Sequence, residues 1–487
     1  MTTSDERLIE SASASGRRRV VLEFEALRRS RLQHFQLIGL AVLLFLALRF
    51  AYDTYIFDLA APVFDNWWHP APDTSWPMVW SLLLVVVTAA FVTRRLETLS
   101  DYLVLLAFVT PVLPMIVVFS DRAVALQFVA VSCAALVALS FIARAPFSLR
   151  GITPSLNAVL PRVPLRWLRT AVLLVIAMTI GLAVAIGGLS FFNLDLSRVY
   201  EFRRFNVVAD NVILGYLTSN VMGLAVPFGM ALALSRRRYW LVAGFVMIAV
   251  IIGGITSHKS HMFTPVLVLA VYFLLGRRCP AKWILWTGIG CALLIGMWEF
   301  FGRSSSLIGQ FTVWRQFFVP AYTNHLHYDF FTEQNESFFY WSQSRVSFGL
   351  TSSDYPFPSS QVLGNFYNGR PFDYNLADYS NMNTGWLGSG FAELGYIGVA
   401  TYTVLLGLML RVADRLSDAL GFRVAGTAVS ISLTGVFTSA DVATAFLSFG
   451  LLGILLLTAM SRKPDAASGG ADATVPERND AHRALAP

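Results

Sequence analysis

Charged residues and cysteines are scarce in this chain of 487 residues. Asp, Glu, Lys and Arg together make up 14% of it, whereas soluble domains carry about a quarter. The three cysteines, Cys133, Cys279 and Cys291, have neither the spacing of a zinc site nor that of a disulfide framework. These shortages exclude a soluble globular domain and a fold held together by disulfides or zinc.

Hydrophobic residues are correspondingly abundant, at 55% of the sequence. They gather in runs close to the roughly 17 to 25 residues that a helix needs to cross a bilayer. We therefore predict an all-α polytopic integral membrane protein with about 12 transmembrane helices. The predicted spans are 35–51, 76–93, 101–119, 123–142, 170–188, 211–234, 239–257, 262–276, 282–300, 385–410, 424–440 and 442–461.

The net charge of +7 is unevenly placed along the chain. With the N-terminus in the cytoplasm, every predicted cytoplasmic segment is rich in Lys and Arg, as the positive-inside rule requires. This placement predicts that both termini are cytoplasmic, and it accounts for the charge without a nucleic-acid partner. The basic residues outside those segments are Arg49, Arg122, Arg198, Arg203, Arg204, Lys259, Arg303, Arg315, Arg345 and Arg370.

The spans divide the chain into five parts. We expect a basic cytoplasmic tail at 1–34, then nine transmembrane helices at 35–300 with an outer loop at 189–210. A large outer loop at 301–384 precedes the last three helices at 385–461. The tail at 462–487 is poor in apolar residues and is predicted to be disordered.

The large loop is polar but full of aromatic residues. Its charged and amide groups would be stranded in hydrocarbon, so it cannot span a bilayer. Disordered segments contain few aromatic residues, which argues against disorder here. We expect a folded cap, or a set of re-entrant segments, on the outer face of the helical bundle.

Two basic patterns precede that loop on the outer face. The first, FFNLDLSRVYEFRRFN at 191–206, is either an amphipathic interfacial helix or a clamp on a lipid-linked phosphate. The second, GGITSHKSHMFTP at 253–265, places Lys259 between two histidines at the end of a span. A lysine at this depth is costly unless it is paired or functional. A lysine among the histidines argues against a metal site.

A third pattern, YSNMNTGWLGSGFAELGYIG at 379–398, leads from the large loop into the tenth span. Its small residues favour close helix contact or a broken helix. Glu393 lies about two turns into the membrane, where an unpaired carboxylate is expensive. It either pairs with an outer arginine as a structural strut or takes part in chemistry.

These patterns give the chain a resemblance to a family. The segments Val199–Arg203 (VYEFR), Thr256–Ser260 (TSHKS) and Asn383–Val399 (NTGWLGSGFAELGYIGV) resemble those of oligosaccharide repeat-unit polymerases of bacterial envelopes, the O-antigen and capsule polymerases of the Wzy type. The resemblance covers roughly residues 35 to 460. The related O-antigen ligases share the plan of many spans with one large periplasmic loop, and the motifs do not exclude them.

The resemblance implies a GT-C-like fold in the bacterial inner membrane and glycosyl transfer at its periplasmic face. The substrate would be an undecaprenyl-pyrophosphate-linked oligosaccharide, polymerised without cofactor or metal. The resemblance also implies membrane lipid as a partner, and a flippase and a chain-length regulator as possible protein partners. Arg203 and Lys259 match the family's basic positions, and the candidates for pyrophosphate binding are Arg203, Arg204, Lys259, Arg315, Arg345 and Arg370, with Arg303 also in the loop.

The acceptor hydroxyl of such a reaction needs a base. We predict His325 and Glu393 as catalytic residues, with His327 and Asp354 next, although a histidine in an aromatic loop is often structural. The arginines would stabilise the leaving pyrophosphate. A competing interpretation is a lipid-linked sugar flippase or another transporter, and a third is a non-catalytic assembly partner. Transporters distribute functional charges through the bundle, whereas the charged residues of this chain gather on one face.

Overall fold

The computed structural model describes residues 30–56, 76–94, 96–121, 125–145, 165–195, 211–302, 310–333, 336–343, 347, 349–355, 357–369, 381–448 and 450–460. All regular secondary structure in these ranges is helical. The tail at 462–487 lies outside the described residues, as do residues 1–29 of the predicted basic tail and 196–210 of the first outer loop.

Eight helical stretches are long and apolar enough to cross a membrane, which supports a multi-pass membrane protein. They are Ser30–Thr54, Leu99–Ser120, Leu126–Arg144, Trp167–Ala185, Val212–Ser235, Tyr239–Thr256, Pro280–Met297 and Trp386–Asp418. Three shorter apolar helices are Trp76–Val92, Ser260–Leu275 and Phe422–Thr438. Each of the twelve predicted spans overlaps one of these helices, except the last, which consists of two short helices.

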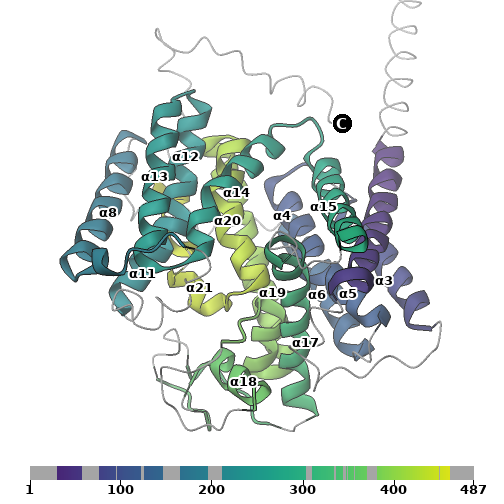
Figure 1. Cartoon of the computed structure of the whole chain (residues 1–487). Helices are drawn as coiled ribbons and strands as arrows, with labels where there is room; N and C mark the ends of the chain where they lie inside the picture. The colour runs from purple at the N-terminus through teal and green to yellow at the C-terminus, as the bar shows by residue number, and fades with distance from the viewer. Residues whose placement is uncertain are drawn as a thin grey trace, which may run out of the picture.

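The helices follow one another along the chain as Figure 1 shows. The first stretch ends in the π-helical turn η1 (Tyr52–Ile56). The others up to residue 302 are α3 (Trp76–Val92), α4 (Leu99–Ala107), η3 (Phe108–Val112), α5 (Leu113–Asp121), α6 (Leu126–Arg144), α8 (Leu165–Ala185), η5 (Gly188–Phe191), α11 (Val212–Asn220), η6 (Val221–Ala225), α12 (Val226–Ser235), α13 (Tyr239–Thr256), α14 (Lys259–Leu275) and α15 (Pro280–Gly302). The helices that follow α15 are η7 (Gln310–Phe318), α17 (Val319–Thr332), α18 (Ser359–Tyr367), α19 (Trp386–Leu420), α20 (Phe422–Thr438), α21 (Val442–Ser448) and α22 (Leu451–Met460).

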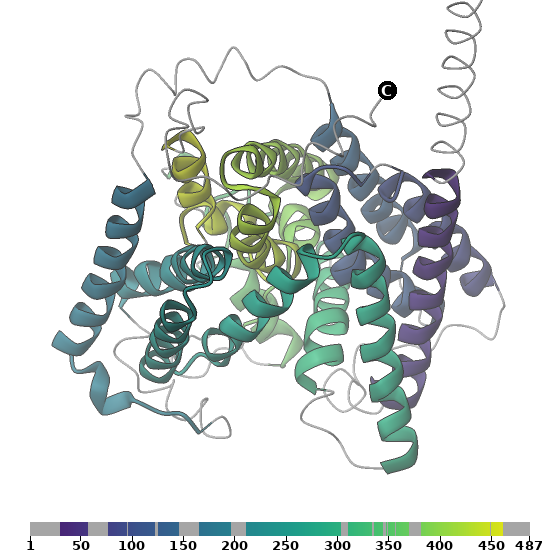
Figure 2. The same cartoon turned by 90° about the horizontal axis from the view of Figure 1, so that it is seen from above.

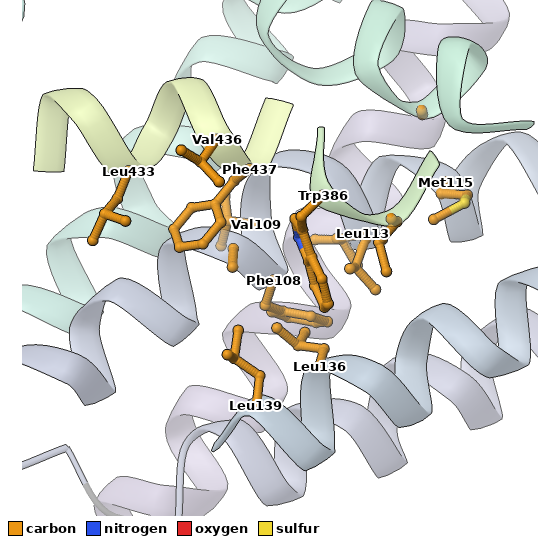
Figure 3. Packing of buried hydrophobic residues seen from close by; sticks show 14 of the residues in the cluster. Phe108, Val109, Leu113, Met115, Leu136, Leu139, Trp386, Leu433, Val436 and Phe437 are labelled. Atoms are coloured by element: carbon orange, nitrogen blue, oxygen red, sulfur yellow. The ribbon is translucent and has the colours of Figure 1, made fainter. Parts of the chain in front are cut away.

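The main hydrophobic core lies where α19 packs against α6, α17 and α20. Trp386, the first residue of α19, is completely buried there. Figure 3 shows its ring among Phe108 and Leu113 from η3 and α5 and Leu136 from α6. Since this ring fills the space between several helices, it fixes the start of α19 and with it the end of the large loop.

The basic ends of the helices gather at one end of the bundle. Several long-range contacts join these ends. They are Arg144 to Asp101 (2.7 Å) and to the Phe91 carbonyl (2.9 Å), Ser100 to Asp414 (2.7 Å), Arg423 to the Tyr272 carbonyl (2.6 Å) and Gln33 to Cys279 (3.1 Å). These contacts place the ends of several helices side by side at this end of the bundle.

The opposite end carries α17, α18 and the rest of the described part of the large loop, at the bottom of Figure 1. The contacts that join helix ends here are Arg49 to Ser120 (2.6 Å), Tyr322 to Tyr52 (2.9 Å), Asn193 to the Gly254 carbonyl (3.0 Å) and Tyr402 to Asp441 (2.7 Å). The loop is therefore attached to the helix ends at the end of the bundle away from the basic cluster.

Candidate functional site

Helix α17 carries both histidines of the large loop. Pro320 stands at its start, where a missing N–H costs no helical hydrogen bond. Most of its residues are buried on every side, but His325, Asp329 and Glu333 are half-buried or exposed. Their spacing of four residues puts them on one face of the helix. From the sequence this stretch was predicted only to be part of a folded loop, so the shared face was not predicted.

His327 is completely buried, and its tautomer follows from its contacts. Its Nδ1 lies 2.7 Å from the Thr323 carbonyl, which can only accept, so Nδ1 carries the proton. Nε2 therefore presents a lone pair, and it has no hydrogen-bond partner among the described residues. Burial lowers the pKa of His327 to about 4, which keeps the ring neutral at pH 7.

His325 lies on the more open face of the same helix. Its Nδ1 is nevertheless buried and without a described hydrogen-bond partner. Burial lowers its pKa to about 4, while the carboxylate of Glu333 opposes this shift. Both rings are thus neutral imidazoles that can accept a proton, and a nearby anion would make them stronger bases.

Asp329 and Glu333 form a carboxyl pair on the face that His325 shares. Burial, followed by the hydrogen bond and charge of Glu333, raises the pKa of Asp329 to about 6. The Tyr367 hydroxyl lies 3.1 Å from Asp329 and donates to the Leu326 carbonyl at 2.8 Å. Burial and the charge of Asp329 raise the pKa of Tyr367, which stays protonated. The Asp329 carboxyl group therefore takes up a proton closer to neutral pH than a free aspartate does.

Asn324 ties this helix to the start of α19. Its Oδ1 accepts from the Thr384 hydroxyl (3.0 Å) and from the Gly388 N–H (2.6 Å), while its Nδ2 donates to the Pro320 carbonyl (2.7 Å). The side chain is fully buried and all these bonds are internal. The position of α17 against α19 is therefore fixed by polar bonds as well as by packing.

Helix α19 is broken at the place where the third sequence pattern favours close contact or a break. Leu394 and Gly395 have non-helical backbone angles, with φ of 57° and ψ of −139° at Gly395. Such angles are open almost only to glycine. A Cβ on Gly398 would lie 1.9 Å from the Gly390 carbonyl oxygen, so the two turns beside the break approach closely.

The large loop occupies the break. The Phe339 N–H donates to the Ala392 carbonyl (3.0 Å) and the Tyr340 N–H to the Glu393 carbonyl (2.9 Å). The Trp341 N–H donates to the Glu393 carboxylate. These bonds satisfy backbone groups that the interrupted helix leaves without partners. Glu393 is buried, and in the described part of the chain it has no ion-pair partner.

A second carboxyl group lies near Glu393. The Tyr402 hydroxyl donates to Asp441 at 2.7 Å, and the Trp341 indole donates to that hydroxyl at 3.1 Å. Asp441 also accepts from the Thr444 N–H at the start of α21 (2.7 Å) and acts electrostatically on Glu393. The loop, α19 and α21 thus meet in one polar network at the end of the bundle that carries the large loop.

The first two basic patterns also meet. The Asn193 N–H donates to the Gly254 carbonyl (3.0 Å), and the Phe192 ring packs where a side chain at Gly254 would lie. Beside this contact the chain turns at Ser257, and His258 and His261 approach with ring centroids 4.9 Å apart. Lys259 begins α14 at this turn, but its side chain is outside the described residues.

The structure locates only some of the predicted anion-binding residues. Arg315 is exposed in η7, just before α17. Arg203, Arg204, Arg345 and Arg370 lie outside the described residues. No contact between His325 and Glu393 is described, although their helices pack together. Among the described residues, no group of three or more His, Cys, Asp and Glu side chains is placed to hold a metal ion.

Sequence reasoning missed several residues of these networks, namely Asn324, Asp329, Glu333, Tyr402 and Asp441. A helical pattern with charges four residues apart could have identified Asp329 and Glu333. The other three become visible only through contacts between distant segments. Comparisons of the chain with protein-family models, with curated proteins and with solved structures gave no match.

Proposed function

We propose that this protein is a membrane glycosyltransferase that polymerises undecaprenyl-pyrophosphate-linked oligosaccharide repeat units. The observation that carries the proposal is the set of neutral histidines and carboxyl groups on α17 and at the break in α19. This set lies under a folded loop at the end of an otherwise apolar bundle. A lipid-linked sugar presents its pyrophosphate and its sugar at that boundary.

The reaction joins the acceptor hydroxyl to the anomeric carbon of the donor. As the oxygen attacks, the bond from that carbon to the pyrophosphate oxygen breaks, and the lipid pyrophosphate leaves as an anion. The acceptor's proton passes to a base, for which His325, His327 and Glu393 are the candidates. Arginines of the outer loops and Lys259 stabilise the leaving group. A pyrophosphate beside the histidines would favour their protonated form.

The proposal also covers the number of membrane spans and the side of the membrane on which the termini and the large loop lie. Twelve spans, two cytoplasmic termini and an outer loop in the periplasm agree with the gathering of basic helix ends at one end of the bundle. The bacterial inner membrane is the location in which such a lipid-linked substrate is available. An O-antigen ligase would use the same lipid pyrophosphate with a different acceptor.

One observation favours a second candidate, a transporter of lipid-linked sugars. Broken helices with buried charged groups form the substrate sites of many transporters. The break at Gly395 beside Glu393 has this form. It differs from the usual transporter site in that backbone bonds from the large loop fill it.

The test uses the native host with alanine at Arg203, Lys259, Arg315 or Arg345, and asparagine at His325 or His327. Arg237→Ala, at the opposite end of the bundle, is the matched control. With membrane levels confirmed, surface polysaccharide is separated on a gel. Collapse to single repeat units supports the polymerase. Long chains left unattached indicate a ligase, and normal chain length in all six variants would overturn the proposed chemistry.

A further inference from the structure

A groove at the basic end of the bundle is formed by other helices than the site described above. Residues of α8, α12, α13 and the turn between the last two line it, and about 500 Å³ of empty space, including its open mouth, lies among them. Its walls are apolar, with Leu173 from α8, Leu232 from α12 and Phe245 from α13. The charged residues that line it are Arg169, Arg236 and Arg238.

The groove lies beside α8, a helix that is packed on one face and exposed on the other. On the packed face Val172, Val175, Ile176 and Ile180 contact a separate apolar core that includes residues of η6, α12 and α13. On the exposed face Leu173 and Leu174 are each more than half exposed. Figure 2 shows α8 at the edge of the molecule. The opening between α8 and its neighbours therefore faces the surroundings of the bundle, which for an apolar helix are lipid chains.

The three arginines carry positive charge that the described residues do not balance. No carboxylate lines the groove, and none of the three has an ion pair among the described residues. The Nε of Arg169 is buried without a hydrogen-bond partner. Arg236 and Arg238 both repel the charge of Arg169. An anion among them would relieve this repulsion and take up the unsatisfied donor.

We propose that this groove binds an anionic phospholipid, with its phosphate among Arg169, Arg236 and Arg238 and an acyl chain along the apolar walls. Basic pockets between transmembrane helices on the cytoplasmic side bind such headgroups. A soluble phosphate would satisfy the arginines but leave the apolar walls uncovered, so the lipid is the occupant that matches both parts of the groove. This site does not depend on the proposed glycosyl transfer.

The experiment titrates the purified full-length protein in neutral detergent with phosphatidylglycerol and counts bound lipids by native mass spectrometry. Phosphatidylcholine of the same chain length and glycerol 3-phosphate serve as comparison ligands. We expect tight binding of phosphatidylglycerol alone. In the variant R169Q/R236Q/R238Q its apparent Kd should rise by about tenfold or more.

The matched control is R237Q/R277Q/R278Q, which removes the same charge at the same end without touching the groove. It should bind phosphatidylglycerol like the wild type. Equal weakening in both variants would overturn the proposal, because it would show a general charge effect. Binding of phosphatidylcholine as tight as that of phosphatidylglycerol, or of glycerol 3-phosphate alone, would also overturn it. Should the triple variant fail to fold, R169Q alone gives the same comparison against R237Q.

Discussion

Two histidines two residues apart acquire different surroundings from one helix. His327 donates from Nδ1 to a carbonyl of its own helix and is fully buried, whereas His325 shares a face with Asp329 and Glu333. The choice of base in the sequence analysis, His325 with Glu393, is still a prediction. His327 was named after these two, and in the structure its Nε2 lone pair has no hydrogen-bond partner among the described residues.

Burial of His327 predicts a pH-dependent stability. Its pKa falls from 6.5 to about 4 on folding, so the unfolded chain takes up the proton first as the pH drops. The wild type should lose on the order of 3 kcal/mol from this group between pH 6.5 and 4, and nothing further above pH 6.5. H327N keeps a donor for the Thr323 carbonyl but cannot titrate. Unfolding by denaturant across this range should show a smaller loss for H327N, and identical slopes would contradict a buried neutral imidazole.

Gly398 predicts a packing effect at a single residue. A Cβ there would lie 1.9 Å from the Gly390 carbonyl oxygen, and backbone on both sides leaves little room to move. Gly398→Ala should cost roughly 1–3 kcal/mol of folding free energy. Gly244→Ala is the control, since open space surrounds that helical position and alanine favours helix there. Thermal unfolding in detergent should separate the two, and equal melting temperatures would contradict the close approach.

At the scale of elements, the large loop and α19 depend on each other. The loop residues Phe339, Tyr340 and Trp341 use their backbone N–H groups to fill the break, and the break exists because Gly395 adopts a conformation closed to other residues. Helix α17 is fixed to the same helix through Asn324. Glu393 is therefore placed by the break and the loop together.

Gly395→Ala should detach the loop from α19. The substitution strains the backbone by roughly 1–3 kcal/mol and favours a continuous helix, whose own N–H groups would take the Ala392 and Glu393 carbonyls. Hydrogen exchange in peptides covering 337–343 should become faster. Gly349→Ala is the control, because Gly349 also has a positive φ but lies in open space away from the break. Unchanged exchange in the first variant would show that the break does not hold the loop.

For the whole molecule, the distribution of polar groups gives the bundle two distinct ends. The contacts of Arg144 with Asp101 and of Arg423 with the Tyr272 carbonyl lie at one end, while the histidines, the carboxyl pair and the network around Glu393 lie toward the other. The proposed transferase chemistry and the proposed lipid groove fall at opposite ends. In the topology that we propose from the positive-inside rule, the first end is periplasmic and the second is cytoplasmic.

This assignment predicts the sidedness of chemical labelling. In a variant without native cysteines, Leu350→Cys lies on the loop, where Leu350 is 86% exposed, and Ser30→Cys lies exposed at the basic end. A membrane-impermeant maleimide should label Leu350→Cys in spheroplasts and Ser30→Cys only after permeabilisation. Labelling of both residues from the same side would contradict the odd number of crossings, nine, that we predict between residues 30 and 350. Labelling of Ser30→Cys in spheroplasts and of Leu350→Cys only after permeabilisation would show the opposite orientation.

The sequence by itself determined where the membrane helices run. Each requires a long apolar run, and a polar stretch in hydrocarbon leaves groups without partners, so composition alone identifies the spans and the large loop. It also indicated a close contact or break in α19, because small residues at 385–398 have little other use in a membrane helix. The helix α17 within the loop was not identified, since its buried faces match no amphipathic pattern.

Only the tertiary structure decided which polar groups meet. Asp441 reaches Tyr402, Asn324 reaches Gly388, and Trp341 reaches Glu393 across 39 to 64 residues of sequence. The arginines of the groove are likewise brought together from α8 and from the turn between α12 and α13. Hydrophobic periodicity sets the length and depth of a helix, whereas such pairs depend on how helices rotate and pack, which is fixed by side-chain fit throughout the bundle.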